Sequence, residues 1–284
     1  MRIVLLGPTG SGKSILAYQI AKKINGEIVS ADSRQVYRYL NIGTNKEIFS
    51  DIRTHLIDMI TPKEVYSVYD FKKDANKAIK KIESEGKVAI ITGGTNFYIK
   101  SLIYNIDYSH STINPLLENK SKEELWELLK DKNLTFFNNL NNSDKNNIRR
   151  LKRYLSLDLL DNQKPPLILD PKYRTYSIDI DLEKIKENIE YRTHEMIKKG
   201  LIEETVDILD MGFSEKDPGF KITGYSEVID YKNNIITNEK DLEERINRST
   251  YRLAKKQRTF EKGIKDRIVM ESEEIIKHIE KSHF

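Results

Sequence analysis

The feature that most constrains this chain lies in its first fourteen residues, where a short apolar run, RIVLL, leads into a glycine-rich loop. The loop fits G-x-x-x-x-G-K-[ST], the P-loop pattern, and consists of Gly7, Pro8, Thr9, Gly10, Ser11, Gly12, Lys13 and Ser14. Backbone N–H groups of such a loop turn inward around phosphate oxygens, Lys13 adds a cation, and Ser14 can hold Mg²⁺. A helix expected over residues 15–24 directs its positive end at the anion. The sequence therefore predicts a phosphate site, without stating which phosphate compound binds or whether phosphoryl transfer occurs.

Composition excludes several classes of protein. The 284 residues are 38% hydrophobic and 32% charged, and none is cysteine. Disulfides, thiolate catalysis and cysteine-ligated zinc are thereby excluded, and a reducing, cytoplasmic location is expected. The N-terminus predicts a strand rather than a signal peptide, and no apolar run approaches the roughly 18 residues of a membrane span.

The first hundred residues alternate between strand and helix patterns. Strands are expected at residues 3–7, 27–30 and 88–91, and helices at 15–24 and 69–85. This alternation predicts an α/β fold of the P-loop NTPase type, with a parallel sheet flanked by helices. Ligands of such sheets bind at the carboxyl ends of the strands. Three loops, beginning at Gly7, Asp32 and Gly93, should therefore meet in one crevice.

The composition changes between residues 104 and 166, where Asn, Lys and Asp dominate and the apolar spacing becomes helical. We expect residues 1–103 to form the first part of the core, residues 104–166 a small helical insertion, and residues 167–284 the return to the core with C-terminal helices. In this last part we expect strands at 175–180 and 268–270 and long helices at 182–211 and 240–262.

Asp32 follows the second expected strand and faces the P-loop across the crevice. A carboxylate there can act as a base or a Mg²⁺ ligand, or can simply cap the turn at Gln35 or Val36. Ser33, Arg34 and Gln35 are polar groups on the same loop that can hydrogen-bond a nucleobase. The strand that ends at Thr92 lacks the acidic residue that an NTPase usually carries there, which weakens ATP hydrolysis as the function.

Two groups of basic residues stand out in a chain with a net charge of only +4. One group comprises Lys145, Arg149, Arg150, Lys152 and Arg153, and the other Arg245, Arg248, Arg252, Lys255, Lys256 and Arg258. Spacings of three and four place Arg245, Arg248 and Arg252 on one helical face. Such runs are often ordinary solvated faces, but two of them favour a polyanionic partner. Taken by itself, Arg192 has the sequence pattern of an ordinary surface arginine.

Seven segments together resemble the tRNA dimethylallyltransferase family, whose members prenylate the adenosine just 3′ of the anticodon, at position 37. They are GPTGSGKS (7–14), SADSRQVYRYLNIGTNK (30–46), RTHLID (53–58), YSVYDF (66–71), GGTNFYI (93–99), ITGYSE (222–227) and LAKKQRTF (253–260). The resemblance covers nearly the whole chain and is weakest over residues 105–144. It implies transfer of a dimethylallyl group to N6 of adenosine, with release of diphosphate.

The resemblance also implies roles for individual residues. The P-loop would bind the diphosphate of dimethylallyl diphosphate rather than ATP, with Thr9 near the reacting centre and Lys13 and Arg192 on the diphosphate. Asp32 would be the general base for the adenine amine. The expected tRNA contacts are Asp32, Ser33, Arg34, Gln35, Thr95, Arg149, Arg150, Thr223, Gly224, Tyr225, Arg248 and Arg252. Mg²⁺ is the implied cofactor, with Ser14 as a ligand. We also expect the protein to be a monomer, to bind the anticodon stem-loop of tRNA and not to bind a membrane.

The sequence departs from the family pattern in four places. Asn188 stands where a second arginine usually precedes Arg192 by one turn, an arginine expected near Asn147 is missing, Phe260 replaces a tryptophan, and the insertion is short. Two other functions share some of these features. A small-molecule or nucleotide kinase shares the P-loop, the aspartate after the second strand and an arginine-bearing insertion, and a non-catalytic P-loop protein could bind nucleic acid.

Overall fold

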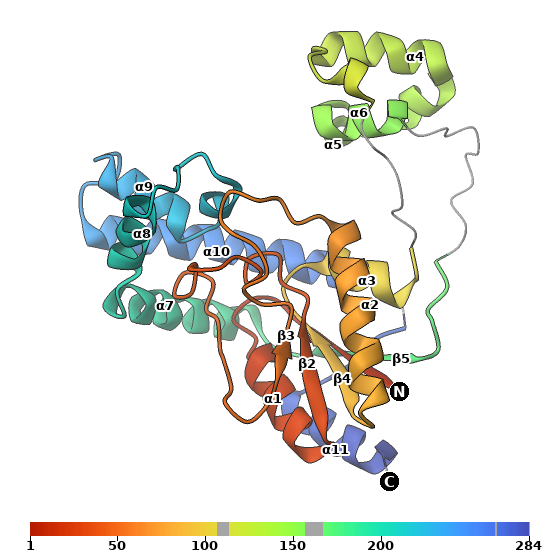
Figure 1. Ribbon diagram of the computed structural model, residues 1–284, viewed down its shortest axis with the longest axis vertical. Coiled ribbons are helices and arrows are strands. Elements are labelled where there is room, and N and C mark those ends of the chain that lie inside the picture. Colours follow the sequence, from red (N-terminus) through yellow and green to blue (C-terminus); the bar gives the residue numbers. More distant parts are fainter. Residues whose placement is uncertain (107–113, 157–166, 265, 284) are drawn as a thin grey trace. The chain divides into compact units, whose positions relative to one another are not determined.

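The computed structural model describes residues 1–106, 114–156, 167–264 and 266–283 (Figure 1). The chain divides into two compact units, one formed by residues 1–106 with 169–284 and the other by residues 107–168. Parts of the predicted insertion, residues 107–113 and 157–166, lie outside the described residues. No helix of the described residues is long and apolar enough to cross a membrane.

The first unit is built on a six-stranded parallel sheet, as the strand–helix alternation predicts. Its strands are β1 (Arg2–Leu6), β2 (Gly26–Ser30), β3 (Thr54–His55), β4 (Val88–Thr92), β5 (Tyr173–Ile178) and β6 (Ile268–Met270), in the order β3-β2-β4-β1-β5-β6. β1 lies centrally, with Ile3 opposite Ile90 of β4 and Arg174 of β5. The loop after β1 therefore emerges between the loops that follow its neighbours.

Helices cover both faces of the sheet, and the alternation of side chains along β1 shows why. Ile3 and Leu5 pack in the same cluster as α1 (Lys13–Lys23) and α11 (Ser272–His283). Val4 and Leu6 point to the other face and pack with α2 (Val68–Ser84) and α3 (Asn96–Ile103). Successive residues of a strand point to opposite faces, so a run that is apolar throughout predicts a strand buried on both sides.

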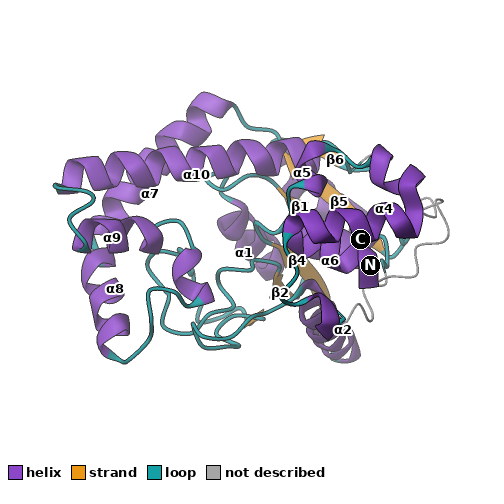
Figure 2. Cartoon of the chain, turned by 90° about the horizontal axis from the view of Figure 1, so that it is seen from above, coloured by secondary structure: helices purple, strands orange, loops and turns teal. Residues whose placement is uncertain are grey.

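A second layer of helices belongs to the same unit: α7 (Leu182–Lys198), α8 (Leu201–Asp210), α9 (Tyr225–Lys232) and α10 (Glu239–Glu261). The prediction of one long helix over residues 182–211 is wrong, because Gly200 adopts φ 95° and separates α7 from α8. The helix expected at 240–262 is confirmed as α10. α7 and α10 run side by side (Figure 2), with Ile185 and Ile189 packed in one cluster with Ala254.

The second unit is small and helical. It contains α4 (Lys122–Asn139), α5 (Asn142–Lys145) and α6 (Ile148–Ser156), together with a 3₁₀ turn at Pro115–Leu117. A second 3₁₀ turn, at Pro218–Lys221, belongs to the first unit. α4 is interrupted at Asn133, whose side chain accepts a hydrogen bond from the amide of Phe136. A separate apolar core holds the unit together, made by Leu117, Leu125, Leu129, Phe137 and Leu151.

Candidate active site

A cavity of about 670 Å³ lies at the carboxyl ends of the central strands. Three loops line it, as the sequence predicts: the P-loop after β1, residues 32–35 after β2, and residues 92–97 after β4. Helices α7 and α10 complete the wall with Asn188, Tyr191, Arg192, Met196, Leu253, Lys256, Gln257 and Phe260. The residues that the sequence associates with phosphate and with a nucleobase therefore share one cavity.

The P-loop has the backbone that its glycines predict. Gly10 adopts φ 83°, and a Cβ there would approach the carbonyl oxygen of Ile185 to 3.2 Å, so a side chain would be both strained and crowded. Gly12, also left-handed, immediately precedes α1. Because no side chain caps the first turn of α1, its N–H groups are oriented to receive an anion.

Lys13 is the buried cation of the loop. Its ammonium group donates to the carbonyl oxygen of Pro8 at 2.6 Å, and the hydroxyl of Ser11 lies 3.5 Å away. Burial lowers the pKa of Lys13 to about 8; the charges of Asp32 and Glu261 oppose this shift and that of Arg192 adds to it. A bound anion would raise the pKa of Lys13 again, because it adds a further negative charge beside the ammonium group.

Arg192 does not behave as an ordinary surface arginine. It reaches the cavity from α7, and its buried Nε has no hydrogen-bond partner among the described residues. Burial is the main cause that lowers its pKa to about 10, and the nearby charge of Arg34 acts in the same direction. A buried guanidinium with an unused donor is expensive unless an anion binds it. This orphan donor is the strongest structural indication of an anionic ligand.

Asp32 is held by two backbone amides. One carboxylate oxygen accepts from the amide of Arg34 at 2.9 Å, and the other accepts from the amide of Gly94 at 3.3 Å. The turn-capping alternative is thus realised at Arg34 rather than at Gln35 or Val36. The carboxylate still lines the cavity and has acceptor capacity left, because each of its oxygens has a second lone pair.

Ser33 and Thr95 connect the loops that follow β2 and β4. The Thr95 hydroxyl accepts from the amide of Ser33 at 2.8 Å and donates to the Ser33 hydroxyl at 2.9 Å. Arg34 also lines the cavity. Ser33, Arg34 and Thr95 therefore lie together beside Asp32 at the cavity.

The structure contradicts one predicted tRNA contact, the side chain of Tyr225, and leaves the contact of Gln35 as a prediction. Gln35 lines the cavity, but its amide is engaged by the Ser30 hydroxyl and by the carbonyls of Thr44 and Asn45. Tyr225 is fully buried, so its side chain holds the fold and is not a surface for RNA. Gly224 is buried at the start of α9, while Thr223 is partly exposed.

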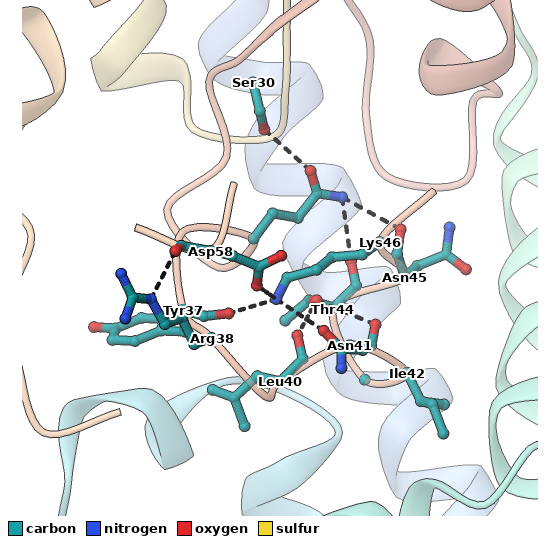
Figure 3. A network of polar contacts seen from close by, with 12 residues as sticks. Ser30, Tyr37, Arg38, Leu40, Asn41, Ile42, Thr44, Asn45, Lys46 and Asp58 are labelled. Atoms are coloured by element: carbon teal, nitrogen blue, oxygen red, sulfur yellow. Dashed lines mark hydrogen bonds and ion pairs between the residues drawn. The ribbon is translucent and has the colours of Figure 1, made fainter. Parts of the chain in front are cut away.

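Sequence reasoning missed the network that shapes the loop over residues 41–46. The Lys46 ammonium group, with only 2% of its side chain exposed, donates to the Tyr37 carbonyl at 2.5 Å, to the Asn41 side chain at 3.0 Å and to Asp58 at 2.5 Å (Figure 3). Burial lowers the pKa of Lys46, and Asp58 opposes the shift. The motifs that contain Lys46 and Asp58 were recognised, but their contact arises only in the folded chain.

A second missed contact set surrounds Glu204 on α8. Its carboxylate accepts from the amides of Asn41 and Ile42 and from the phenol of Tyr225, at 2.5 Å. The Tyr225 oxygen in turn accepts from the amide of Gly43 at 3.1 Å. The buried Tyr225 and the partly buried Glu204 therefore fix the loop that carries Thr44 and Asn45 into the cavity wall.

The predicted basic surfaces are found on exposed helices of separate units. On α10, Arg248 and Arg252 are exposed, with 65% of the Arg248 side chain accessible and Glu244 at 3.9 Å. On α6, Arg149 is exposed, whereas Arg150 forms an ion pair with Asp144. The charge available to a polyanion is thus smaller than the count of arginines suggests.

The donors available to Mg²⁺ are few. No cluster of three acidic or histidine side chains suited to a metal occurs among the described residues. Ser14 lines the cavity, as does the carboxylate of Asp32. Mg²⁺ commonly keeps several waters and takes one or two protein oxygens together with phosphate oxygens, so this sparse oxygen set fits a phosphate-bound ion.

A sequence model of a protein family and individual relatives of known name point to the same family. The sequence model of the IPP transferase family matches residues 35–263. A tRNA dimethylallyltransferase of Endomicrobium trichonymphae is 36% identical over 281 residues, covering 93% of this chain and 92% of that protein.

Solved structures agree with the fold. A tRNA Δ(2)-isopentenylpyrophosphate transferase of Staphylococcus epidermidis superposes with a TM-score of 0.72 at 29% identity, covering 99% of this chain and 97% of that one. A eukaryotic dimethylallyltransferase, captured acting on tRNA, superposes with a TM-score of 0.81 at 23% identity, covering 95% of this chain and 73% of that one. The last likeness concerns the fold alone.

Proposed function

Because the chain belongs to the IPP transferase family, we propose that it transfers a dimethylallyl group from dimethylallyl diphosphate to N6 of the adenosine 3′ of the anticodon in tRNA. The observation that carries this proposal is the shared cavity, in which the P-loop and the unpaired Arg192 donor face the loop of Asp32. One part suits a diphosphate and the other suits an amine that must lose a proton.

The diphosphate half of the cavity would stabilise the leaving group. The allylic carbon becomes electrophilic only as the diphosphate departs, so charge develops on the phosphate oxygens. Lys13, Arg192 and the P-loop amides are pre-oriented donors for that charge, the kind of arrangement that contributes most to many enzymatic rate enhancements. Bound Mg²⁺, held by Ser14 with the diphosphate, would supply further neutralisation of the same charge.

The other half would accept the adenine. The exocyclic amine is a weak nucleophile and becomes strongly acidic as it bonds to carbon, so an ordinary ionised carboxylate suffices as base. Asp32 is that base in our proposal, with its orientation set by the amides of Arg34 and Gly94. Thr95, Ser33 and Arg34 lie beside it to contact the nucleotide. The adenosine must leave the anticodon-loop stack to enter, so base flipping is expected.

Binding of the rest of the tRNA is assigned to the basic surfaces. We propose that Arg248 and Arg252 on α10, and Arg149 and Arg150 on α6, contact the phosphates of the anticodon stem-loop. The insertion, residues 104–166, would thus be a tRNA-contacting part of a monomeric enzyme. Single-stranded loops are the part of an RNA that proteins read most readily.

A single incubation tests the proposal against the kinase alternative. Unmodified tRNA is incubated with the protein and either dimethylallyl diphosphate labelled in the prenyl group or γ-labelled ATP. We expect prenyl label in the tRNA and none from ATP, because β4 ends at Thr92, with no acidic residue of the NTPase type. Transfer from ATP to a small molecule, with tRNA unmodified, would favour the kinase, and tRNA binding without either transfer would favour the non-catalytic alternative.

A further inference from the structure

Gln257 lies on α10, far in sequence from the P-loop, yet its side chain bonds to both halves of the cavity. Its carbonyl oxygen accepts from the amide of Thr9 at 2.8 Å, and its NH₂ group donates to the carbonyl of Gly94 at 2.7 Å. The residue is only 8% exposed, so water competes little for these two bonds.

The bonds of Gln257 continue to Asp32. The amide of Gly94 donates to the Asp32 carboxylate at 3.3 Å, so a single residue, Gly94, links the carboxylate to the contact with Gln257. A Cβ at Gly94 would lie 2.6 Å from the Gln257 nitrogen and 3.1 Å from an Asp32 oxygen. The three groups are therefore packed at close contact, and a change in one displaces the others.

The backbone of α10 is anchored at the same point. The side-chain amide of Asn96 donates to the carbonyl oxygen of Gln257 at 3.1 Å. Gln257 is thus held through its main chain while its side chain spans the P-loop and the loop after β4. This is a fixed spacer rather than a mobile surface residue.

We propose that Gln257 is a positioning residue that sets the separation between the P-loop and Asp32. The inference rests on the proposed function, since it concerns the approach of an amine to a carbon held by the diphosphate. The contact also commits the Thr9 amide to Gln257, so this amide is not offered to the diphosphate. Reacting atoms must approach to about 3–3.5 Å, and a displacement of about 1 Å can cost on the order of 100-fold in rate.

The test compares Gln257→Met with wild-type protein. Methionine keeps the length of the side chain but offers only a weak sulfur acceptor to Thr9 and no donor to Gly94. We expect the single-turnover rate of tRNA prenylation to fall on the order of 100-fold, with the KM of each substrate changed less than about threefold. Thr259→Val is the matched control, because Thr259 is exposed on α10 and its hydroxyl donates to the Lys255 carbonyl of the same helix.

A double-mutant cycle separates positioning from a general structural role. If Gln257 acts through the placement of Asp32, Gln257→Met should slow the Asp32→Asn protein far less than it slows wild type. Thermal unfolding monitors the fold, and Gln257→Glu, which keeps an acceptor for Thr9 but cannot donate when ionised, replaces Gln257→Met if that variant does not fold.

Two results would overturn the inference: a wild-type rate in the folded Gln257 variant, or rate losses that multiply independently with Asp32→Asn. Both results can be interpreted only if the wild-type protein produces prenylated tRNA. Absence of that product would instead refute the proposed function, so the two failures are distinguishable.

Discussion

The side-chain amide of Asn188 donates a 2.8 Å hydrogen bond to the carbonyl oxygen of Gly10. Asn188 lies on α7, one turn before Arg192, so a single helix both braces the P-loop and supplies a guanidinium to the cavity. The family pattern places a second arginine at this position. In this chain the neutral amide instead ties α7 to the loop backbone and adds no charge beside Lys13 and Arg192.

Asn188→Asp should weaken the binding of diphosphate. The carboxylate loses the donor to Gly10 and places a negative charge beside the proposed anion site, so we expect the Kd for inorganic diphosphate to rise about tenfold or more, equivalent to roughly 1.4 kcal/mol. Isothermal titration calorimetry measures the change. Glu187→Gln, on the exposed neighbouring position, should leave the Kd unchanged; equal affinities of Asn188→Asp and wild type would remove Asn188 from the site.

The binding of diphosphate should weaken at alkaline pH through Lys13. Burial lowers its pKa to about 8 in the ligand-free protein, so the cation is present below pH 8 and is lost as the pH rises above it. We expect the affinity for inorganic diphosphate to fall between pH 8 and pH 9.5. The fall should be absent in Lys13→Arg, which stays charged, and Lys13→Ala should bind weakly throughout and lose about 10²–10³ in rate. A flat wild-type profile would contradict this role.

Tyr225→Phe should destabilise the protein. The change removes the bond to Glu204 and leaves the amide of Gly43 without its acceptor in a partly buried position, a loss of about 1–3 kcal/mol in the free energy of unfolding. Burial also raises the pKa of this phenol, so it stays protonated and continues to donate at alkaline pH. Urea unfolding measures the change, with Tyr231→Phe as control. Unchanged stability but weaker tRNA binding would mean that Tyr225 contacts RNA after all.

The sequence predicts the sheet well because its determinants are local. The apolar run before Gly7, the run that ends at Thr92 and the strand at Ile268–Met270 each pair in the expected sheet, and the three loops meet where their order implies. The break at Gly200 was missed because the apolar spacing continues across it, and the two-residue strand β3 is too short to show a period.

The parts of the site that could not be predicted depend on contacts between distant segments. Gln257 meets Thr9 across 248 residues, and Glu204 meets Ile42 across 162. The sequence marks Asn188 as a departure from the family pattern, but nothing in its neighbours predicts the bond to Gly10. Tyr225 is likewise fully buried and packs in the core, although a tRNA contact is expected for the motif that contains it.

Charge reversal on α10 should weaken the binding of tRNA. If Arg248 and Arg252 contact phosphates, their joint change to Glu should lower the affinity for tRNA while the affinity for dimethylallyl diphosphate stays constant. The slope of log K against log salt should also become shallower, by about 0.7–0.9 for each lost contact. Filter binding at several salt concentrations gives both quantities. The control is the double variant Lys77→Glu and Lys80→Glu on the exposed face of α2, which makes the same change in net charge. If both double variants weaken tRNA binding equally, the α10 residues form an ordinary solvated face.

The most direct test of the account is single-turnover formation of N6-dimethylallyladenosine in tRNA by wild type and by Asp32→Asn, read by mass spectrometry of the nucleosides. The account predicts the prenylated nucleoside from wild type, and a rate lower by about 10²–10⁴ in the variant, with both substrates still bound, because asparagine keeps the shape of the side chain but cannot take the proton. Near-wild-type turnover in Asp32→Asn would reduce Asp32 to the cap of the Arg34 amide. Absence of prenylated adenosine from wild type would contradict the account as a whole.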